Sequence, residues 1–190
     1  TVNLSAVAAI AQVDAMAATQ TFSSITTNLT ISRTGPINVI QVNGNILLAG
    51  TESILLDGNK DDIFIIRATG RISLGVNTSI RSTANQSNKI LFTSLGNMLL
   101  NAKNAIGTFI NDAAMDIGNG SYNCNFIFKS GNFTTAGSGN IYGTMFDGGG
   151  AGNTIKVNGD VEVNGKLTFA PDAEGDVSTC ARNPMQGTLP

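Results

Sequence analysis

Apolar residues recur along this chain in short runs on either side of a glycine, and the runs repeat at a fixed interval. The segments VIQVNGNILL, IIRATGRISL and LFTSLGNMLL align without gaps, so that Gly44, Gly70 and Gly96 are equally spaced along the chain. Two later copies surround Gly131 and Gly159, each after a longer interval. Repeats of this kind predict an array in which each copy packs on its neighbours.

Three columns of equivalent positions are apolar in every copy. They stand four residues before the glycine, two residues after it and ten residues after it: Ile40, Ile66, Phe92, Ile127 and Ile155; Ile46, Ile72, Met98, Phe133 and Val161; Ile54, Ile80, Ile106, Ile141 and Phe169. Because side chains alternate along a strand, such columns predict strands that share one interior. Three strands of about five residues, joined by corners, account for one repeat. The pattern therefore predicts an all-β solenoid with triangular coils of about 26 residues over residues 28–170. The glycine marks a corner, where a positive φ or a close backbone approach is needed.

A further apolar column, five residues before the glycine, falls on the opposite face of the first strand: Val39, Ile65, Leu91 and Phe126. The N-terminal segment is expected to cover this face, because apolar and small residues recur there at helical spacing: Leu4, Val7, Ala8, Ala11 and Ala15. Asn3 or Ser5 is placed to cap the helix. We predict one long α-helix over residues 3–19, packed along the side of the coils, and a polar C-terminal tail over residues 171–190. The whole chain, residues 1–190, is predicted to be a single domain.

The alanine-rich N-terminal segment is followed by ATQTFSSITTNLTI, INVIQVNGNILL, DDIFIIRATGRISL, SNKILFTSLGN and AIGTFI. Over about residues 6–118 these motifs resemble the ice-binding-like β-solenoid domains and the closely related bacterial choice-of-anchor A surface domains. The resemblance implies a secreted or cell-surface right-handed solenoid with a long helix alongside. Some members of this family bind ice through a flat face, and others are adhesive or matrix modules. The longer interval before Gly131 and the tail that contains Cys180 depart from the family pattern.

Composition and charge narrow the function classes. The 190 residues include no histidine, which removes Ser-His-Asp and Cys-His catalysis and the usual zinc and iron ligand sets. The 11 Lys and Arg are scattered and the net charge is −2, so no nucleic-acid partner is expected. The apolar run over residues 2–18 is interrupted by Gln12 and Asp14, so no membrane span is predicted. The start at Thr1 and the richness in Asn, Gly, Thr and Ser lead us to expect a secreted, processed protein.

Cys124 and Cys180 are the two cysteines of the chain. In an extracellular protein an even number of cysteines predicts a disulfide. This bridge would close a long loop and contribute roughly 4 kcal/mol to stability. Two unrelated buried thiols are the alternative.

The outward positions of the third strand of each copy form the candidate flat binding face. Regular Thr, Ser and Asn side chains at the repeat spacing can order water in a lattice-like array, and the predicted face consists of Thr51, Ser53, Asn77, Ser79, Ser138, Asn140 and Thr168. Lys103, Ala105 and Lys166 fall on the same predicted face, and strongly hydrated ammonium groups disturb an ordered-water surface. An ordinary solvated wall is the alternative interpretation.

The segment DGNKD is the candidate metal site. Asp57, Asn59 and Asp61 are spaced as oxygen ligands of a hard cation, so calcium is the candidate metal, and no other cofactor is predicted. The same residues also fit a plain turn between strands. Asp61 and Asp62, or Asp160 and Glu162, are the enzymatic alternative, as an acid/base pair, but the chain has no Trp and only two Tyr for stacking on a substrate. We expect no catalytic activity.

The sequence therefore predicts a secreted, non-catalytic structural or adhesive protein of the extracellular space or cell surface. Such an array ends in unpaired strand edges, and the tail Asp172–Pro190 is expected to pair with the edge of a neighbouring copy and extend the sheet into a fibre. The partners would be further copies of the chain or an extracellular matrix. In the alternative arrangement the tail folds back as a cap. The alternative function is ice binding, with ice as the partner.

Overall fold

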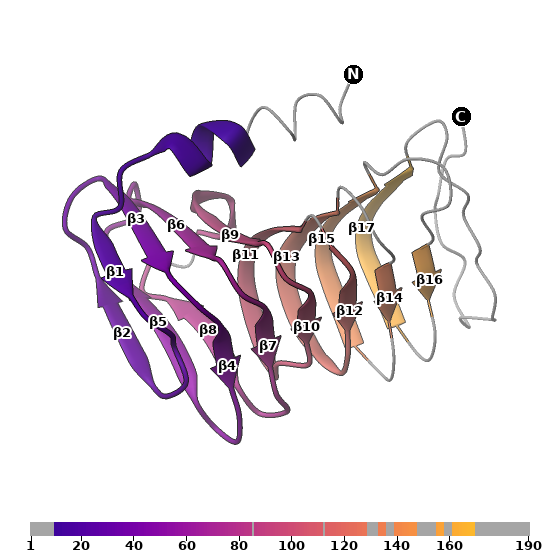
Figure 1. Ribbon diagram of the computed structural model, residues 1–190. Coiled ribbons are helices and arrows are strands. Elements are labelled where there is room, and N and C mark those ends of the chain that lie inside the picture. The colour runs from indigo at the N-terminus through magenta and orange to yellow at the C-terminus, as the bar shows by residue number, and fades with distance from the viewer. Residues whose placement is uncertain are drawn as a thin grey trace.

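The computed structural model describes residues 10–84, 86–111, 113–128, 133–135, 139–147, 155–157 and 161–169. These residues form almost entirely parallel strands, arranged in an 11-stranded sheet and a 6-stranded sheet. Figure 1 shows the strands following one another from β1 and β2 at one end of the molecule to β16 and β17 at the other.

The larger sheet has a main path and a branch. The main path runs through β1 (Gln20–Phe22), β3 (Ile37–Val42), β6 (Ile63–Ala68), β9 (Ile90–Ser94), β11 (Asn104–Asn111), β13 (Gly120–Phe128), β15 (Gly139–Asp147) and β17 (Val161–Phe169). The branch joins this path at β11 through β8 (Ser79–Ser82), β5 (Ser53–Asp57) and β2 (Leu29–Ser32). A short 3-10 helix, η1 (Ser87–Lys89), precedes β9.

The smaller sheet consists of short strands in chain order: β4 (Ile46–Leu48), β7 (Ile72–Leu74), β10 (Met98–Leu100), β12 (Met115–Ile117), β14 (Phe133–Thr135) and β16 (Ile155–Val157). In β4 and β7 the first and last residues are buried and the middle residue is half-buried. This alternation is typical of a strand with one face on the core. In contrast, β6 (IFIIRA) is buried on both faces and is rich in β-branched residues, as parallel strands covered on both sides commonly are.

One continuous apolar core lies between the two sheets. It contains inward residues of both, such as Ile40 of β3 and Ile46 of β4, which are fully buried. The rings of Phe92 and Phe109 stack with centroids 4.8 Å apart, and those of Phe109 and Phe126 with centroids 5.8 Å apart. Equivalent side chains of successive strands therefore contact one another along the core.

The first two copies of the repeat pair as their spacing predicts. Ile40 pairs with Ile66, Ile46 with Ile72 and Ile54 with Ile80, each one repeat further along the chain, and all of them are buried. The glycines of the repeat also follow one another: Gly70 N donates to Gly44 O at 2.9 Å and Gly96 N donates to Gly70 O at 3.2 Å. None of these three glycines has a positive φ. A Cβ on Gly70 would lie 2.9 Å from the carbonyl carbon of Gly44, so close backbone approach is the reason for glycine at this corner.

Beyond Met98 the interval between paired strands becomes shorter. Met98 pairs backward with Ile72, one full repeat away, but forward with Met115, which is much nearer along the chain. A loop over residues 83–89 joins β8 to β9, whereas β11 covers the same corner within one strand. The first residue of β11, Asn104, pairs with Ser79 of β8, and later residues of β11 pair with β9. The branch and the main path therefore merge at β11.

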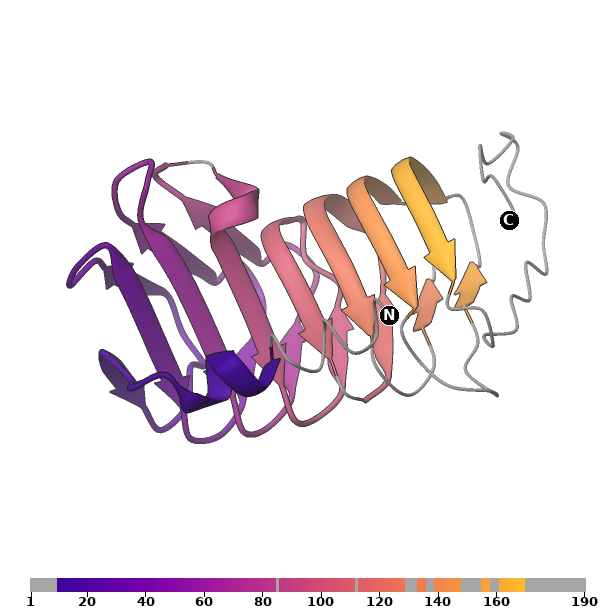
Figure 2. The ribbon, with the colours of Figure 1, turned by 90° about the horizontal axis from the view of Figure 1, so that it is seen from above.

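The prediction of a right-handed solenoid with triangular coils of about 26 residues is wrong. The strands form a curled half-barrel of mostly parallel sheet (Figures 1 and 2), because β11, β13, β15 and β17 are long strands that pass the corner without a loop. The long interval before Gly131 also contains an additional strand, β12, which the glycine alignment missed.

The later copies of the repeat are shifted from their predicted positions. Ile155 was aligned with Ile40, but it pairs with Phe133 in the smaller sheet. Phe126 was expected to face outward and Ile127 inward, yet Phe126 is fully buried in the core and Ile127 is partly exposed. A shift of one residue along a strand exchanges its two faces.

The predicted long helix over residues 3–19 is also wrong. Within the described part of the chain the helix covers residues 10–15, and residues 1–9 lie outside that part. The side chain of Arg67 caps the C-terminal end of the helix. Its Nη1 donates to the carbonyl oxygens of Val13 at 2.6 Å and Asp14 at 2.8 Å, and both residues belong to the last turn. Thr19 N then donates to Val39 O at 2.7 Å, which directs the chain into β1.

The short helix covers part of the outer face of the larger sheet. Val13 packs with Val39 and Ile65 in a second apolar cluster, to which the partly buried Met16 and Leu91 contribute. This is the face for which the sequence predicted a helical cover. No helix among the described residues has both the length and the apolar character needed to cross a membrane.

Candidate functional site

A row of polar side chains crosses the larger sheet on the face away from the core. Strand pairing aligns its members one after another: Ser53, Ser79, Asn104, Ser121 and Asn140. Asn104 and Asn140 are exposed and the three serines are half-buried. Because neighbouring strands lie about 4.8 Å apart, the row presents hydroxyl and amide groups at a regular interval.

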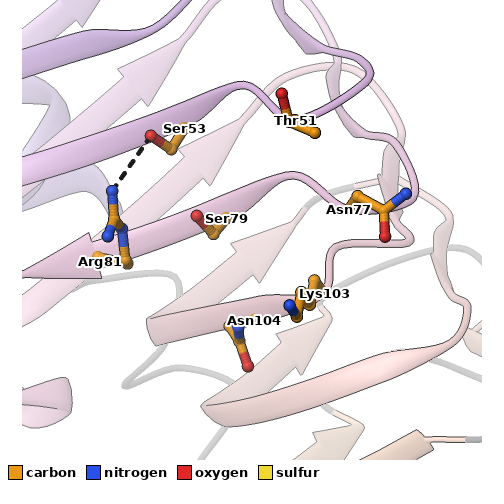
Figure 3. A pocket seen from close by; sticks show the side chains of 7 residues that line it. All are labelled: Thr51, Ser53, Asn77, Ser79, Arg81, Lys103 and Asn104. Carbon is orange, nitrogen blue, oxygen red and sulfur yellow. Dashed lines mark hydrogen bonds between the residues drawn. The ribbon is translucent and has the colours of Figure 1, made fainter.

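The row borders a shallow hollow of about 430 Å³ (Figure 3), which we call the first hollow. Its lining residues come from β5, β8 and β11 and the turns before them: Thr51, Ser53, Asn77, Ser79, Arg81, Lys103 and Asn104. Arg81 Nη2 donates to Ser53 Oγ at 3.5 Å. Asn28 Oδ1 accepts from Ser53 N at 2.8 Å, so Ser53 is held from both sides.

A second hollow of about 300 Å³ adjoins the first and shares Arg81 and Asn104 with it. Its other lining residues combine an apolar floor with polar walls: Ile80, Ala105, Ile106, Ser82, Ser121 and Asn123. It lies where β8 meets β11, which is the point at which the branch merges with the main path. The merging of the strands therefore creates the second hollow.

The structure brings together part of the predicted flat face. Thr51, Ser53, Asn77 and Ser79 surround the first hollow, and Asn140 continues the polar row. Thr168 does not belong to the row, because its backbone pairs with Phe146 near the far end of β15, whereas Asn140 pairs with Glu162. Ser138 lies outside the described residues.

Sequence reasoning missed five polar residues of the site: Arg81, Ser82, Asn104, Ser121 and Asn123. The alignment of equal repeats placed Ala105 on this face, but Ala105 is buried and Asn104 pairs with Ser79. The signal that could have found Asn104 and Ser121 is the shorter interval between them, which equals the interval from Met98 to Met115.

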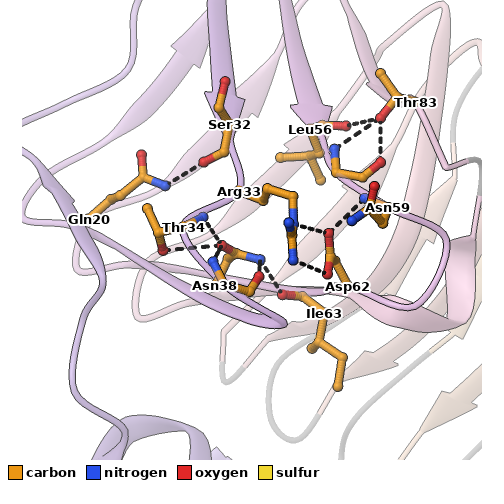
Figure 4. A network of polar contacts seen from close by, with 12 residues as sticks. Gln20, Ser32, Arg33, Thr34, Asn38, Leu56, Asn59, Asp62, Ile63 and Thr83 are labelled. Carbon is orange, nitrogen blue, oxygen red and sulfur yellow. Dashed lines mark hydrogen bonds and ion pairs between the residues drawn. The ribbon is translucent and has the colours of Figure 1, made fainter.

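The segment DGNKD forms a turn held by Asp62 (Figure 4). Asp62 Oδ2 accepts from Asn59 N at 2.6 Å and lies 2.6 Å from Arg33 Nε, while Asp62 Oδ1 accepts from Arg33 Nη2 at 3.2 Å. Asp61 points to solvent with its carboxylate 3.8 Å from Lys89 Nζ. These contacts therefore agree with the interpretation of DGNKD as a turn between strands.

Asp57, Asn59 and Asp61 are all exposed, and the structure gives Asp61 and Asp62 cationic partners. Over the described ranges no three His, Cys, Asp or Glu side chains lie close enough together to hold a metal ion. The calcium site stays a prediction from residue spacing.

The ion pair of Asp62 predicts an acid-sensitive contribution to stability. The hydrogen bond from Asn59 N, followed by the interaction with Arg33, lowers the pKa of Asp62. A carboxyl whose pKa is lower in the folded state stabilises the fold above its unfolded pKa of about 4, and this contribution is lost as the pH falls through the folded value. We expect Asp62→Asn to be less stable than wild type at pH 7, and the difference to shrink below about pH 4.

Urea midpoints measured between pH 7 and the acid limit of folding test this expectation. Asp61→Asn is the matched control, because Asp61 is largely exposed, and it should leave the midpoint almost unchanged at neutral pH. A deficit for Asp62→Asn that stays the same at every pH would contradict the assigned role of the charge.

Cys124 lies in the core beside Tyr122, and both side chains are buried. Burial raises the pKa of the Cys124 thiol and of the Tyr122 phenol. Tyr122 Oη donates to Leu100 O at 2.7 Å, which satisfies the hydroxyl inside the core. Cys180 lies outside the described residues, so the Cys124–Cys180 disulfide stays a prediction.

Comparisons of this chain with family profiles, with curated proteins and with solved structures find no match.

Proposed function

We propose that this protein is a secreted, non-catalytic structural or adhesive protein that associates head to tail with further copies of itself. The observation that carries the proposal is the edge formed by β1 and β2, which we call the N-terminal edge. Among the described residues β1 pairs only with β3, and β2 only with β5. An unpaired strand edge is a template for the backbone of another chain.

The N-terminal edge lacks the features that usually block such pairing. Residues 19–32 (TQTFSSITTNLTIS) contain no charged residue and no proline. Proteins commonly protect an edge with lysines, prolines or bulges. Phe22 and Leu29 are only partly buried against the core, so apolar surface is also present beside the edge.

The direction of the strands favours a second copy as the partner. Because all pairs are parallel, β16 and β17 run in the same direction as the strands with which each sheet begins. A copy placed with its β16–β17 end against the N-terminal edge would continue the larger sheet without reversal. Such a contact does not close on itself and produces a filament. The absence of histidine and the richness in Asn, Gly, Thr and Ser support a non-catalytic, extracellular role.

Thr30→Lys tests the N-terminal edge. Thr30 is exposed in β2, and a lysine there would lose hydration when a second copy pairs with the strand. We expect wild-type protein to form oligomers that grow with concentration, and the variant to need about tenfold higher concentration for the same degree of association. Sedimentation velocity over a concentration series measures this, and negative-stain microscopy shows whether the oligomers are filaments.

Thr51→Lys provides the matched control, because Thr51 is an exposed threonine in the turn before β5 and does not lie on the edge. It should assemble as wild type does. A wild-type protein that stays monomeric at every concentration, or equal effects of the two substitutions, would overturn the proposal.

Ice binding is the second candidate, and the regular row of serines and asparagines favours it. Arg81 and Lys103 beside the row count against it, since a charged, strongly hydrated group disturbs an ordered-water surface. Thermal hysteresis and ice-recrystallisation assays decide this candidate. Activity that is lost in Ser79→Tyr, at the centre of the row, would place ice binding first, whereas an inactive wild type would remove it.

A further inference from the structure

We infer that the two adjoining hollows form one trough that binds an anionic polysaccharide. This inference rests on the extracellular, adhesive part of the proposed function and names the ligand class. The trough is continuous because Arg81 and Asn104 line both hollows, and it crosses β5, β8, β11 and β13. A chain-like ligand can therefore lie along the polar row rather than enter a closed pocket.

The charges of the trough select an anion. Arg81 and Lys103 line the first hollow, and neither makes an ion pair with any described residue. Among the residues that the structure describes, no Asp or Glu lines either hollow. The chain as a whole carries a net charge of −2, so the two cations that line this hollow are not a consequence of general basicity. A guanidinium group offers paired donors that fit a carboxylate or a sulfate.

The hydrogen-bonding groups of the trough fit a sugar chain. Ser79, Asn104 and Ser121 lie on successive strands about 4.8 Å apart, which is close to the length of one pyranose unit. Hydroxyl and amide groups can both donate to and accept from sugar hydroxyls. Each step along the ligand would therefore meet a new polar side chain.

Apolar contacts are also present for the faces of the sugar rings. Ala105 and Ile106 form part of the floor of the second hollow. Beyond the second hollow, Tyr142 of β15 is 48% exposed. Tyr142 comes directly after Ile141, and Ile141 pairs with Tyr122 of β13. Asn123, which lines the second hollow, comes directly after Tyr122 in the same way. Tyr142 therefore lies on the strand next to the trough. An exposed aromatic ring can stack on the apolar face of a sugar.

The density of charge distinguishes a polysaccharide from a nucleic acid. A nucleic acid carries closely spaced phosphates and needs many cations along its backbone. Two cations among neutral polar groups correspond better to a sugar chain in which anionic groups alternate with hydroxyls.

Binding is best measured in the Thr30→Lys variant, so that assembly does not contribute to the signal. Fluorescence anisotropy with labelled oligogalacturonate and labelled dextran sulfate tests carboxylate and sulfate ligands, and labelled neutral dextran tests the need for charge. We expect an anionic ligand to bind, neutral dextran to bind at least about tenfold more weakly, and binding to weaken as salt is raised. The tighter of the two anionic ligands identifies the preferred group.

Substitutions locate the binding to the trough. Arg81→Gln combined with Lys103→Gln should weaken binding at least about tenfold. Arg71→Gln removes one exposed cation that does not line the trough and should bind as the parent does. Circular dichroism checks that each variant is folded.

Three results would overturn the inference: no binding of either anionic ligand, equal binding of neutral dextran, or unchanged binding in the double variant. Equal affinity for single-stranded DNA would also overturn it, because charge alone would then explain the binding. Sedimentation of the wild type reports separately on the proposed assembly, so failure of one proposal is distinguishable from failure of the other.

Discussion

Phe109→Ala should lower the free energy of unfolding by about 3–5 kcal/mol, one of the largest effects expected of any single substitution in this chain. Phe109 is fully buried in β11, and its ring stacks between those of Phe92 and Phe126. Removing the ring leaves a cavity between two large neighbours, and both lose their stacking contacts. Because β11 joins the branch to the main path, the loss falls where the two parts of the larger sheet meet.

Urea unfolding followed by circular dichroism measures the loss, and Phe109→Leu should recover part of it by refilling the cavity. Leu95→Ala is the control for removal of a large apolar side chain. Leu95 is 68% exposed, so this substitution should change stability by less than about 0.5 kcal/mol. Equal losses for Phe109→Ala and Leu95→Ala would show that the stacked rings do not hold the core.

Gly120→Ala is expected to destabilise the fold by about 3 kcal/mol or more. Gly120 begins β13 with φ +150°, a conformation that side chains disfavour, and a Cβ there would overlap the carbonyl oxygen of Ala102. The obstacle is backbone rather than the end of a flexible side chain, so β13 would have to move away from the preceding chain. This movement would disturb the pairing of Ser121 with Asn104 and hence the polar row.

The control for this substitution is Gly35→Ala. A Cβ on Gly35 meets no atom within 4 Å, and its φ is not positive, so alanine there should be neutral or slightly stabilising. Thermal unfolding of both variants compares the two positions directly. If Gly120→Ala melted at the wild-type temperature, the close approach of β13 to Ala102 would be refuted.

The assembly surface and the ligand surface are independent of each other. The N-terminal edge consists of backbone groups of β1 and β2 at one end of the larger sheet, whereas the trough consists of side chains on one face of that sheet. Filament growth would therefore repeat the trough along the filament rather than cover it. Weak sites repeated in this way bind an extended polysaccharide with an avidity that a single copy does not reach.

The sequence determined the part of the fold in which the repeats have equal length. The constant spacing of Gly44, Gly70 and Gly96 brings each apolar residue next to its counterpart, so one alignment correctly pairs Ile40 with Ile66. Strict alternation then decides which residues are buried. Sequence reasoning also found four lining residues within these regular copies, Thr51, Ser53, Asn77 and Ser79, but it missed Arg81.

Only the tertiary structure decided the arrangement after Met98. Phe126 and Ile127 are both apolar, so hydrophobicity cannot choose which of them faces the core. The stacking of Phe126 on Phe109 makes that choice, and it depends on strands merging at β11. Asn104 and Ser121 entered the site for the same reason, whereas Arg81 lies in a regular copy and pairs with Leu55 at the repeat spacing. Outward polar positions carry no packing constraint that the sequence could reveal, and the register of the neighbouring strand alone places them side by side.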